Sequence, residues 1–129
     1  MPLVRITRRS GRPAVENQAL LDAIHDALVE AFKIPQGDRC QQLVQLAPEH
    51  FELPEGRTAA FTLIEITAFP GRSVEAKRAL YRSMARRFEA AGLSSNDLFI
   101  VIHELPLENW SARNGASSLD AKPAFKLDV

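Results

Sequence analysis

The chain has 129 residues, which is the size of a single domain. Its formal net charge of zero gives no electrostatic reason to bind nucleic acid or an anionic membrane, so neither is expected as a main partner. A single cysteine excludes an internal disulfide, and no apolar run approaches the roughly 20 residues that span a bilayer, so we expect a protein of the reducing cytoplasm.

The first half of the chain predicts a strand, a helix and a second strand. Residues 2–8 begin with a short apolar run that predicts a strand. Residues 14–33 predict a helix, because apolar residues recur there every three or four positions. The members of this stripe are Leu20, Ile24, Ala27, Leu28 and Ala31. Residues 34–37 contain the proline and glycine that end the helix, and residues 39–47 predict the second strand.

The second half predicts the same order of elements. Residues 59–69 predict a strand, and Ser73 is placed to cap the start of a helix over residues 74–91. The apolar stripe of this helix consists of Leu80, Met84, Phe88 and Ala91. Residues 97–105 form a nearly unbroken apolar run, which is typical of a buried central strand.

The two halves repeat at a spacing of 60 residues, since Gly11-Arg12 falls on Gly71-Arg72 and one helix stripe falls on the other. Chance similarity between two amphipathic helices is the alternative, but the repeated Gly-Arg pair favours duplication. We therefore expect an α+β fold of two layers, in which duplicated β-α-β units form a four-stranded mixed sheet with two helices on one face. The predicted single domain, residues 1–129, divides into repeats 2–58 and 59–115 and a tail, 116–129.

Proline directly follows the initiator methionine. A small second residue normally lets the methionine be removed, so we expect the mature chain to begin with the free secondary amine of Pro2. The strand that follows would hold this amine rigidly inside the folded core. The alternative is that Pro2 is only a processing signal.

Several short motifs, taken in order, resemble one known family. They are Met1-Pro2-Leu3-Val4-Arg5-Ile6, Leu21-Asp22-Ala23-Ile24-His25-Asp26-Ala27-Leu28, Ile34-Pro35-Gln36-Gly37-Asp38-Arg39, Gly71-Arg72-Ser73 and Glu108-Asn109-Trp110-Ser111. No single motif is decisive, but their order and spacing resemble the tautomerase superfamily over nearly the whole chain. The chain is most similar to long-chain members of the 4-oxalocrotonate tautomerase and malonate semialdehyde decarboxylase type.

This resemblance implies a cofactor-free homotrimer whose amino-terminal proline is the catalytic group. The apolar sheet face that no helix covers also favours subunits packed sheet against sheet. An α-amino group titrates near pH ~8 in water, and burial and a neighbouring cation such as Arg72 disfavour its charged form. Neutral Pro2 would then be the general base that interconverts the enol and keto forms of a small 2-oxo acid. Arg72 would bind the substrate carboxylate, the alternative being a solvated charge at a helix start.

Asp38 matches the acidic residue that decarboxylase-like members place beside the proline, where it orients or activates water. Its alternatives are a turn aspartate or an ion pair with Arg39. The chain departs from the decarboxylase pattern at Pro70, where those enzymes carry a second arginine, and at Ala112, where they tend to carry phenylalanine. These departures put decarboxylase activity in doubt, so decarboxylation or hydration of a 3-oxo or unsaturated acid is the runner-up.

Residues 106–129 predict irregular structure with a short strand around Phe125. Trp110 either lines the substrate pocket or anchors this segment by packing, and Phe125 is a candidate to close the pocket. No metal site is expected, because the histidines have no carboxylate or cysteine at ligand spacing; they are His25, His50 and His103. A hypothesis of another class is a catalytically idle trimer that only binds carboxylates.

Overall fold

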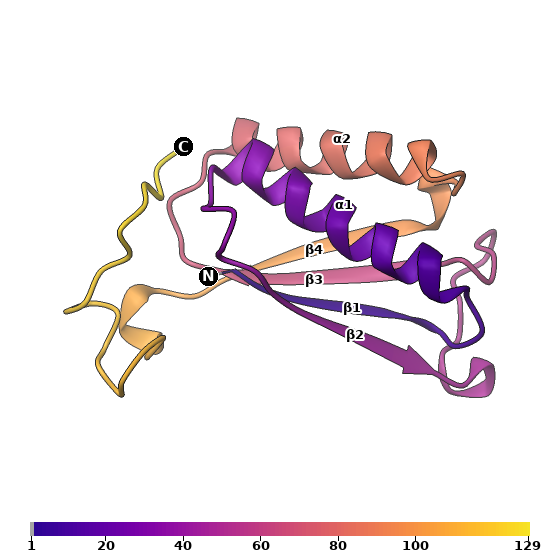
Figure 1. Cartoon of the computed structure of the whole chain (residues 1–129), viewed down its shortest axis with the longest axis horizontal. Helices are drawn as coiled ribbons and strands as arrows, with labels where there is room; N and C mark the ends of the chain where they lie inside the picture. Colours follow the sequence, from indigo (N-terminus) through magenta and orange to yellow (C-terminus); the bar gives the residue numbers. More distant parts are fainter. Residues whose placement is uncertain (1) are drawn as a thin grey trace.

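In the computed structural model, which describes residues 2–129, four strands form one sheet and two helices lie over one of its faces (Figure 1). The strands are β1 (Leu3–Arg9), β2 (Cys40–Leu46), β3 (Thr62–Ala68) and β4 (Leu98–Glu104), and the helices are α1 (Ala14–Phe32) and α2 (Val74–Ala90). The predicted fold class and the predicted order of the elements are therefore confirmed.

The order of the strands in the sheet is β2-β1-β3-β4. β1 and β2 pair in parallel, as do β3 and β4, whereas β1 and β3 are antiparallel. A parallel pair needs a crossover connection, and α1 and α2 supply the two crossovers. Each half of the chain is thus a β-α-β unit, and the antiparallel β1–β3 pairing relates the halves by an approximate two-fold rotation.

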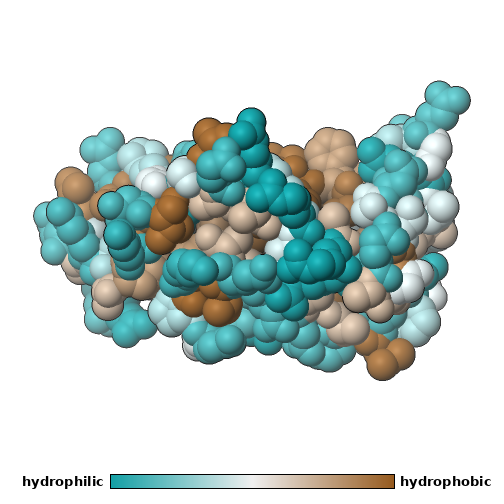
Figure 2. Space-filling view, turned by 90° about the horizontal axis from the view of Figure 1, so that it is seen from above, coloured by the Kyte–Doolittle hydropathy of each residue, from teal (hydrophilic) through white to brown (hydrophobic). Residues whose placement is uncertain are grey.

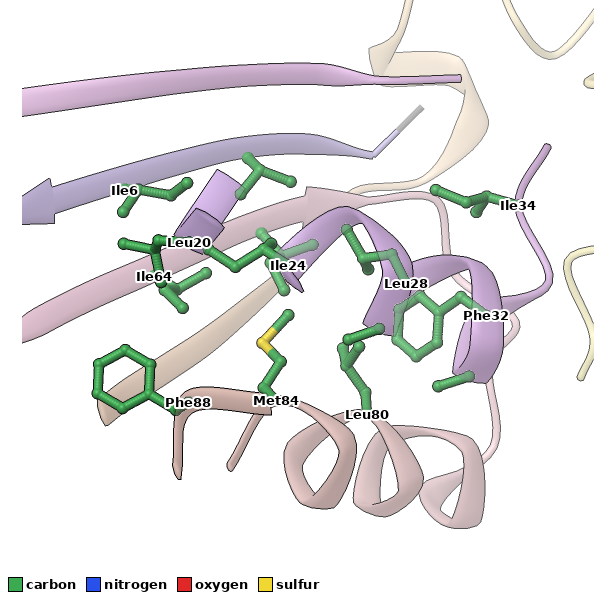
Figure 3. Close-up of a cluster of buried hydrophobic side chains, with 14 of the residues drawn as sticks. Ile6, Leu20, Ile24, Leu28, Phe32, Ile34, Ile64, Leu80, Met84 and Phe88 are labelled. Carbon is green, nitrogen blue, oxygen red and sulfur yellow. The ribbon is translucent and has the colours of Figure 1, made fainter. Parts of the chain in front are cut away.

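The hydrophobic core lies between the helices and the sheet. The central strands contribute Val4, Ile6, Ile64 and Ile66. Figure 3 shows the two helix stripes that meet these residues, with Leu20, Ile24 and Leu28 on α1 and Leu80, Met84 and Phe88 on α2. A fully buried aliphatic or aromatic side chain contributes roughly 1.5–3 kcal/mol, so this layer is the main source of stability.

Local signals explain where the helices begin and end. Ser73 caps α2, because its Oγ accepts a hydrogen bond from the Ala76 N–H at 3.1 Å. Lys33 follows α1 in the left-handed conformation, with a φ of 58°, and its N–H donates to the Val29 carbonyl. Helix lengths are therefore set close to the predicted bounds, and each helix crosses the sheet once.

The prediction of a buried central strand at residues 97–105 is wrong, because β4 lies at an edge of the sheet. The antiparallel pairing of β1 with β3 puts the first strand of each half in the centre, and the second strand of each half then lies outside. One side of β4 faces the core, whereas on the other side Phe99 is 43% exposed.

The strand expected around Phe125 is not found either, since the described residues 119–129 form only turns and bends. This tail runs to the start of α2 (yellow in Figure 1), where the Ser73 N–H donates to the Val129 carbonyl oxygen at 2.9 Å. The first N–H groups of a helix have no partner within the helix. The tail backbone therefore bonds a helix terminus rather than a strand edge.

The outer surface of the helix layer is mainly hydrophilic, with scattered hydrophobic residues (Figure 2). On the other sheet face, apolar Leu3 and Phe99 lie among the polar residues Arg5, Glu65 and His103. This face is more mixed than the sequence predicts, and packing of subunits through it stays a prediction. Within residues 2–129, no helix is long and apolar enough to cross a membrane.

Candidate functional site

Strand register brings the predicted site residues to one end of the sheet. β1 begins beside the first residue of β2 and the last residues of β3, so Pro2 lies at this end. Asp38 leads into β2, Arg72 follows β3, and β4 ends here before the segment that contains Trp110. We call this the Pro2 end. The Pro2 side chain is fully buried there.

Arg72 is the main charged group of the Pro2 end, and it is only 5% exposed. Its Nη1 donates to the Phe69 carbonyl at 3.3 Å. Its Nε and Nη2 are buried without a hydrogen-bond partner among residues 2–129. Nε and Nη2 form the side of a guanidinium that binds a carboxylate through two parallel hydrogen bonds. The structure therefore holds a buried cation with its carboxylate-binding side unsatisfied.

Two aromatic rings flank this guanidinium. The Arg72 Cζ atom lies 4.9 Å from the centre of the Phe32 ring and 6.0 Å from the centre of the Phe125 ring. Both are within the range of cation–π attraction. Burial lowers the pKa of Arg72, while the negative charges of Glu104 and Asp38 act to raise it. The rings and the carboxylates favour the charged form of Arg72 and leave its Nε and Nη2 without a hydrogen-bond partner among residues 2–129.

The turn that carries Arg72 is held by the C-terminal tail. Gly71 has a φ of 125°, a left-handed conformation that favours glycine, and a Cβ there would lie 3.3 Å from the Leu127 side chain and carbonyl oxygen. On the other side of Arg72, the Val129 carbonyl accepts a hydrogen bond from the Ser73 N–H. The tail thus fixes the backbone on both sides of Arg72.

Asp38 lies in a turn, since its N–H donates to the Pro35 carbonyl at 3.0 Å. The guanidinium of the adjacent Arg39 binds Asp22 on α1. Asp38 also lines a hollow of ≈ 540 Å³ together with Phe69 and Phe125. It therefore belongs to the Pro2 end and contributes negative charge near Arg72.

Trp110 packs behind this hollow. Its ring centre lies 4.6 Å from that of Phe69, and its Nε1 donates to the Leu105 carbonyl at 3.1 Å. Its own carbonyl accepts the Ser118 N–H at 2.9 Å. These contacts are those of a packing anchor that supports Phe69 and the start of the tail, whereas Phe125 lines the hollow directly.

The sequence did not single out Phe32, Phe69 or Glu104, although all three lie around Arg72. Phe32 continues the apolar stripe of α1 one position beyond Ala31, which predicts a core residue and not a ring beneath a cation. Phe69 ends one predicted strand and Glu104 lies one residue before the end of another, and only their common position at one sheet end would have pointed to them.

Within residues 2–129, no group of three or more histidine, cysteine, aspartate or glutamate side chains could hold a metal ion. Of the histidines, His25 is buried and its Nε2 lies 2.8 Å from the Gln36 carbonyl oxygen. His103 lies on the uncovered sheet face, with its Nε2 3.5 Å from a Glu65 carboxylate oxygen. The Pro2 end brings together Pro2, the guanidinium of Arg72 and the carboxylate of Asp38.

Two family models match the sequence, both described as tautomerase enzyme, over residues 2–58 and 38–113. The chain is similar to the Probable tautomerase YusQ of Bacillus subtilis (strain 168), with 34% identity over 125 residues that cover 92% of this chain and 98% of the relative. The first of these family matches begins at Pro2, the residue that precedes β1.

Solved structures resemble the whole fold. A malonate semialdehyde decarboxylase, solved as wild type, in an inactivated form and with its first residue changed from proline to alanine, has a TM-score of 0.85 and 30% identity, covering 92% of this chain and 96% of that one. A symmetric trimer of wild-type fused 4-OT has a TM-score of 0.81 and 25% identity, covering 94% and 99%.

Proposed function

Because the chain belongs to the tautomerase family, we propose that it is a keto–enol tautomerase of small 2-oxo acids in which Pro2 is the general base. The observation that carries the proposal is the buried guanidinium of Arg72, with Nε and Nη2 unpaired among the described residues, at the sheet end where β1 starts. A carboxylate is the ligand that this pair of nitrogens fits.

The proposed base is the secondary amine of Pro2 after removal of Met1. Burial disfavours the protonated form of an amine, and the positive charge of Arg72 acts in the same direction. The neutral amine would take the proton of the enol hydroxyl and, as the ammonium, return a proton to the carbon beside the new carbonyl group. The similar malonate semialdehyde decarboxylase was solved with its own first residue changed from proline to alanine, which supports attention to an amino-terminal proline in this chain.

Arg72 would hold the substrate carboxylate through Nε and Nη2 and stabilise negative charge on the dienolate oxygen. Asp38 would favour the charged state of Arg72 through its negative charge. Phe125 would close the hollow over the substrate, and Trp110 would support its wall through Phe69. We also propose a homotrimer, in line with the trimeric fused 4-OT, formed through the uncovered sheet face.

A second candidate is decarboxylation or hydration of a 3-oxo or unsaturated acid, because Asp38 lines the hollow and the fold matches a malonate semialdehyde decarboxylase. In that reaction protonated Pro2 would act as an acid and Asp38 would position water. This candidate ranks below the tautomerase because Pro70 and Ala112 stand where the decarboxylase pattern has an arginine and an aromatic residue.

The test is the ultraviolet-monitored ketonisation of phenylpyruvate enol or 2-hydroxymuconate by untagged protein, with mass spectrometry to verify that the chain starts at Pro2. We expect Pro2→Ala to lose roughly a hundredfold or more in kcat, the size expected of a general base. Equal, slow rates for both proteins would contradict the tautomerase. Release of carbon dioxide from malonate semialdehyde, lost in Asp38→Asn, would then identify the second candidate, and no turnover of either substrate would leave a carboxylate-binding trimer.

A further inference from the structure

The two β-α-β halves place matching residues at opposite ends of the sheet. Because β1 and β3 are antiparallel, the turn after β1 lies at the other end from the turn after β3. The spacing of 60 residues sets Arg12 against Arg72 and Glu16 against Ala76. We call the end where β1 finishes the Arg12 end. It contains a second arginine cluster, centred on the buried Arg8, that the proposed reaction does not use.

Arg8 is the centre of this cluster and is fully buried. Its Nη1 donates to Glu16 Oε2 and to Asn17 Oδ1, both at 2.8 Å. Its Nε donates to Thr62 Oγ1 at 3.1 Å, and its Nη2 donates to the Ala60 carbonyl at 3.3 Å. Every nitrogen of this guanidinium therefore has a partner, and one of those partners is a carboxylate.

Arg12 binds the same carboxylate from the other side. Its Nε donates to Glu16 Oε2 and its Nη2 donates to Glu16 Oε1, both at 2.8 Å. These are the same two nitrogens that have no partner in Arg72. Glu16 thus stands toward Arg12 as a ligand carboxylate would stand toward Arg72. In α2 the matching position is Ala76, which has no carboxylate to offer.

We propose that the Arg12 end is a second carboxylate-binding site, built on the same plan as the Pro2 end, which the chain fills with its own Glu16 side chain. The external ligand that it would accept, once Glu16 is removed, is a small carboxylate held between Arg8 and Arg12. In the native chain Glu16 occupies the Arg12 end, whereas Nε and Nη2 of Arg72 at the Pro2 end have no partner among residues 2–129.

The rest of the Arg12 end fits a binding site without a catalytic base. Thr62 stands at the position that matches Pro2, and an internal residue has no free amine. Asp97 precedes β4 as Asp38 precedes β2, and it raises the pKa of Arg12 as Asp38 acts on Arg72. However, Asp97 is buried and accepts hydrogen bonds from the Thr58 N–H at 2.7 Å and from the Thr58 hydroxyl.

If the ion pair is merely structural, removal of Glu16 destabilises the fold and an added carboxylate does not restore the lost stability. The experiment is therefore the thermal unfolding of Glu16→Ala in sodium acetate, compared with sodium chloride at equal ionic strength and with neutral acetamide. We expect Tm to fall by roughly 10 °C, because the variant leaves the buried Arg8 and the partly exposed Arg12 without their shared carboxylate. Acetate should restore most of the loss and should saturate, whereas chloride and acetamide should not.

The matched control is Glu75→Ala, because Glu75 also lies in the first turn of a helix and pairs with Arg78, but its side chain is 74% exposed. This variant should show no specific response to acetate. If Glu16→Ala does not fold in either salt, Glu16→Ser takes its place, since serine is tolerated near a helix start and its hydroxyl admits water to the guanidinium groups.

A Tm of Glu16→Ala or Glu16→Ser that acetate raises no more than chloride would overturn the proposal. So would an equal acetate effect on Glu75→Ala. The readout does not involve catalysis, so its failure would leave the proposed function untouched. Loss of the tautomerase hypothesis would likewise leave the acetate experiment interpretable.

Discussion

The two Gly-Arg turns have the same sequence spacing to their helices, but their arginines differ in the direction of the pKa shift and in hydrogen-bond pairing. At the Arg12 end, hydrogen bonding to Glu16 raises the pKa of Arg12, and its ion pair is complete. At the Pro2 end, burial lowers the pKa of Arg72, and two of its nitrogens have no partner within residues 2–129. One position of the repeat, Glu16 against Ala76, accounts for this difference. A duplicated fold can thus open one site and close the other by a single side chain.

The unpaired arginine has a cost that the surrounding residues reduce. A buried polar group without a partner costs about 1–3 kcal/mol, and more if it is charged. At the Pro2 end, Phe32, Phe125 and the Phe69 carbonyl offset part of this cost without closing the carboxylate-binding side. The remainder is available to a ligand, because a bound carboxylate would satisfy the two nitrogens.

The largest expected effect comes from removing the unpaired arginine. Arg72→Ala should lower kcat/KM for ketonisation by roughly a thousandfold, because the substrate loses a two-bond contact and the transition state loses a charge partner. Steady-state kinetics measure the loss, and Arg78→Ala, a change on the exposed face of α2, should stay within about threefold of wild type. Similar kcat/KM values for Arg72→Ala and Arg78→Ala would remove Arg72 from the site.

Giving the Pro2 end the carboxylate that the Arg12 end carries should lower kcat/KM nearly as much as Arg72→Ala does. Ala76→Glu gives α2 the carboxylate that α1 carries four residues after its arginine, so it should occupy Arg72 and lower kcat/KM by roughly 30- to 100-fold, equivalent to about 2–3 kcal/mol. The uncharged Ala76→Gln is the matched control and should lose far less activity. If both variants are equally impaired, crowding rather than charge is responsible and the comparison fails.

A smaller effect is expected from the aromatic support of Arg72. Phe125→Leu keeps an apolar side chain but removes the ring 6.0 Å from the guanidinium, and it should raise KM by roughly three- to tenfold with little change in kcat. Tyr81→Leu, an exposed aromatic residue of α2, serves as the control. A loss confined to kcat would show that Phe125 acts on the chemical step and not on carboxylate binding.

The smallest effect is a pH dependence of stability at the Arg12 end. Hydrogen bonding to Arg12 lowers the pKa of Glu16 from its ordinary value of 4.5. Ionised Glu16 therefore stabilises the fold at pH values above this, and the contribution is lost as the pH falls through the lower, folded-state pKa. The difference in Tm between wild type and Glu16→Gln should be largest near neutral pH and shrink on acidification. A difference that stays constant across this range would mean that the Glu16 charge is not what stabilises this end.

Local pattern was a good guide to the helices and a poor one to the edges of the sheet. Ser73 caps α2 where a serine before an apolar period predicts it, because capping depends on residues three positions apart. The apolar run 97–105 gave no sign that β4 lies at an edge, because the order of the strands follows from the antiparallel pairing of β1 with β3, which joins residues far apart in the chain. The tail followed no periodic pattern, and its backbone bonds the start of α2 instead of a strand.

The sequence by itself determined the β-α-β order of each half and the two Gly-Arg turns, since helices, strands and turns depend on residues close together in the chain, and its resemblance to the tautomerase superfamily suggested the candidates Pro2, Asp38 and Arg72. Only the tertiary structure decided that Arg72 is buried with free nitrogens while Arg12 and Arg8 share Glu16. The physical reason is that the pairing and the pKa of a buried arginine depend on which carboxylates and rings the fold brings to it. For Arg72 these come from α1, β4 and the tail, which lie far from it along the chain.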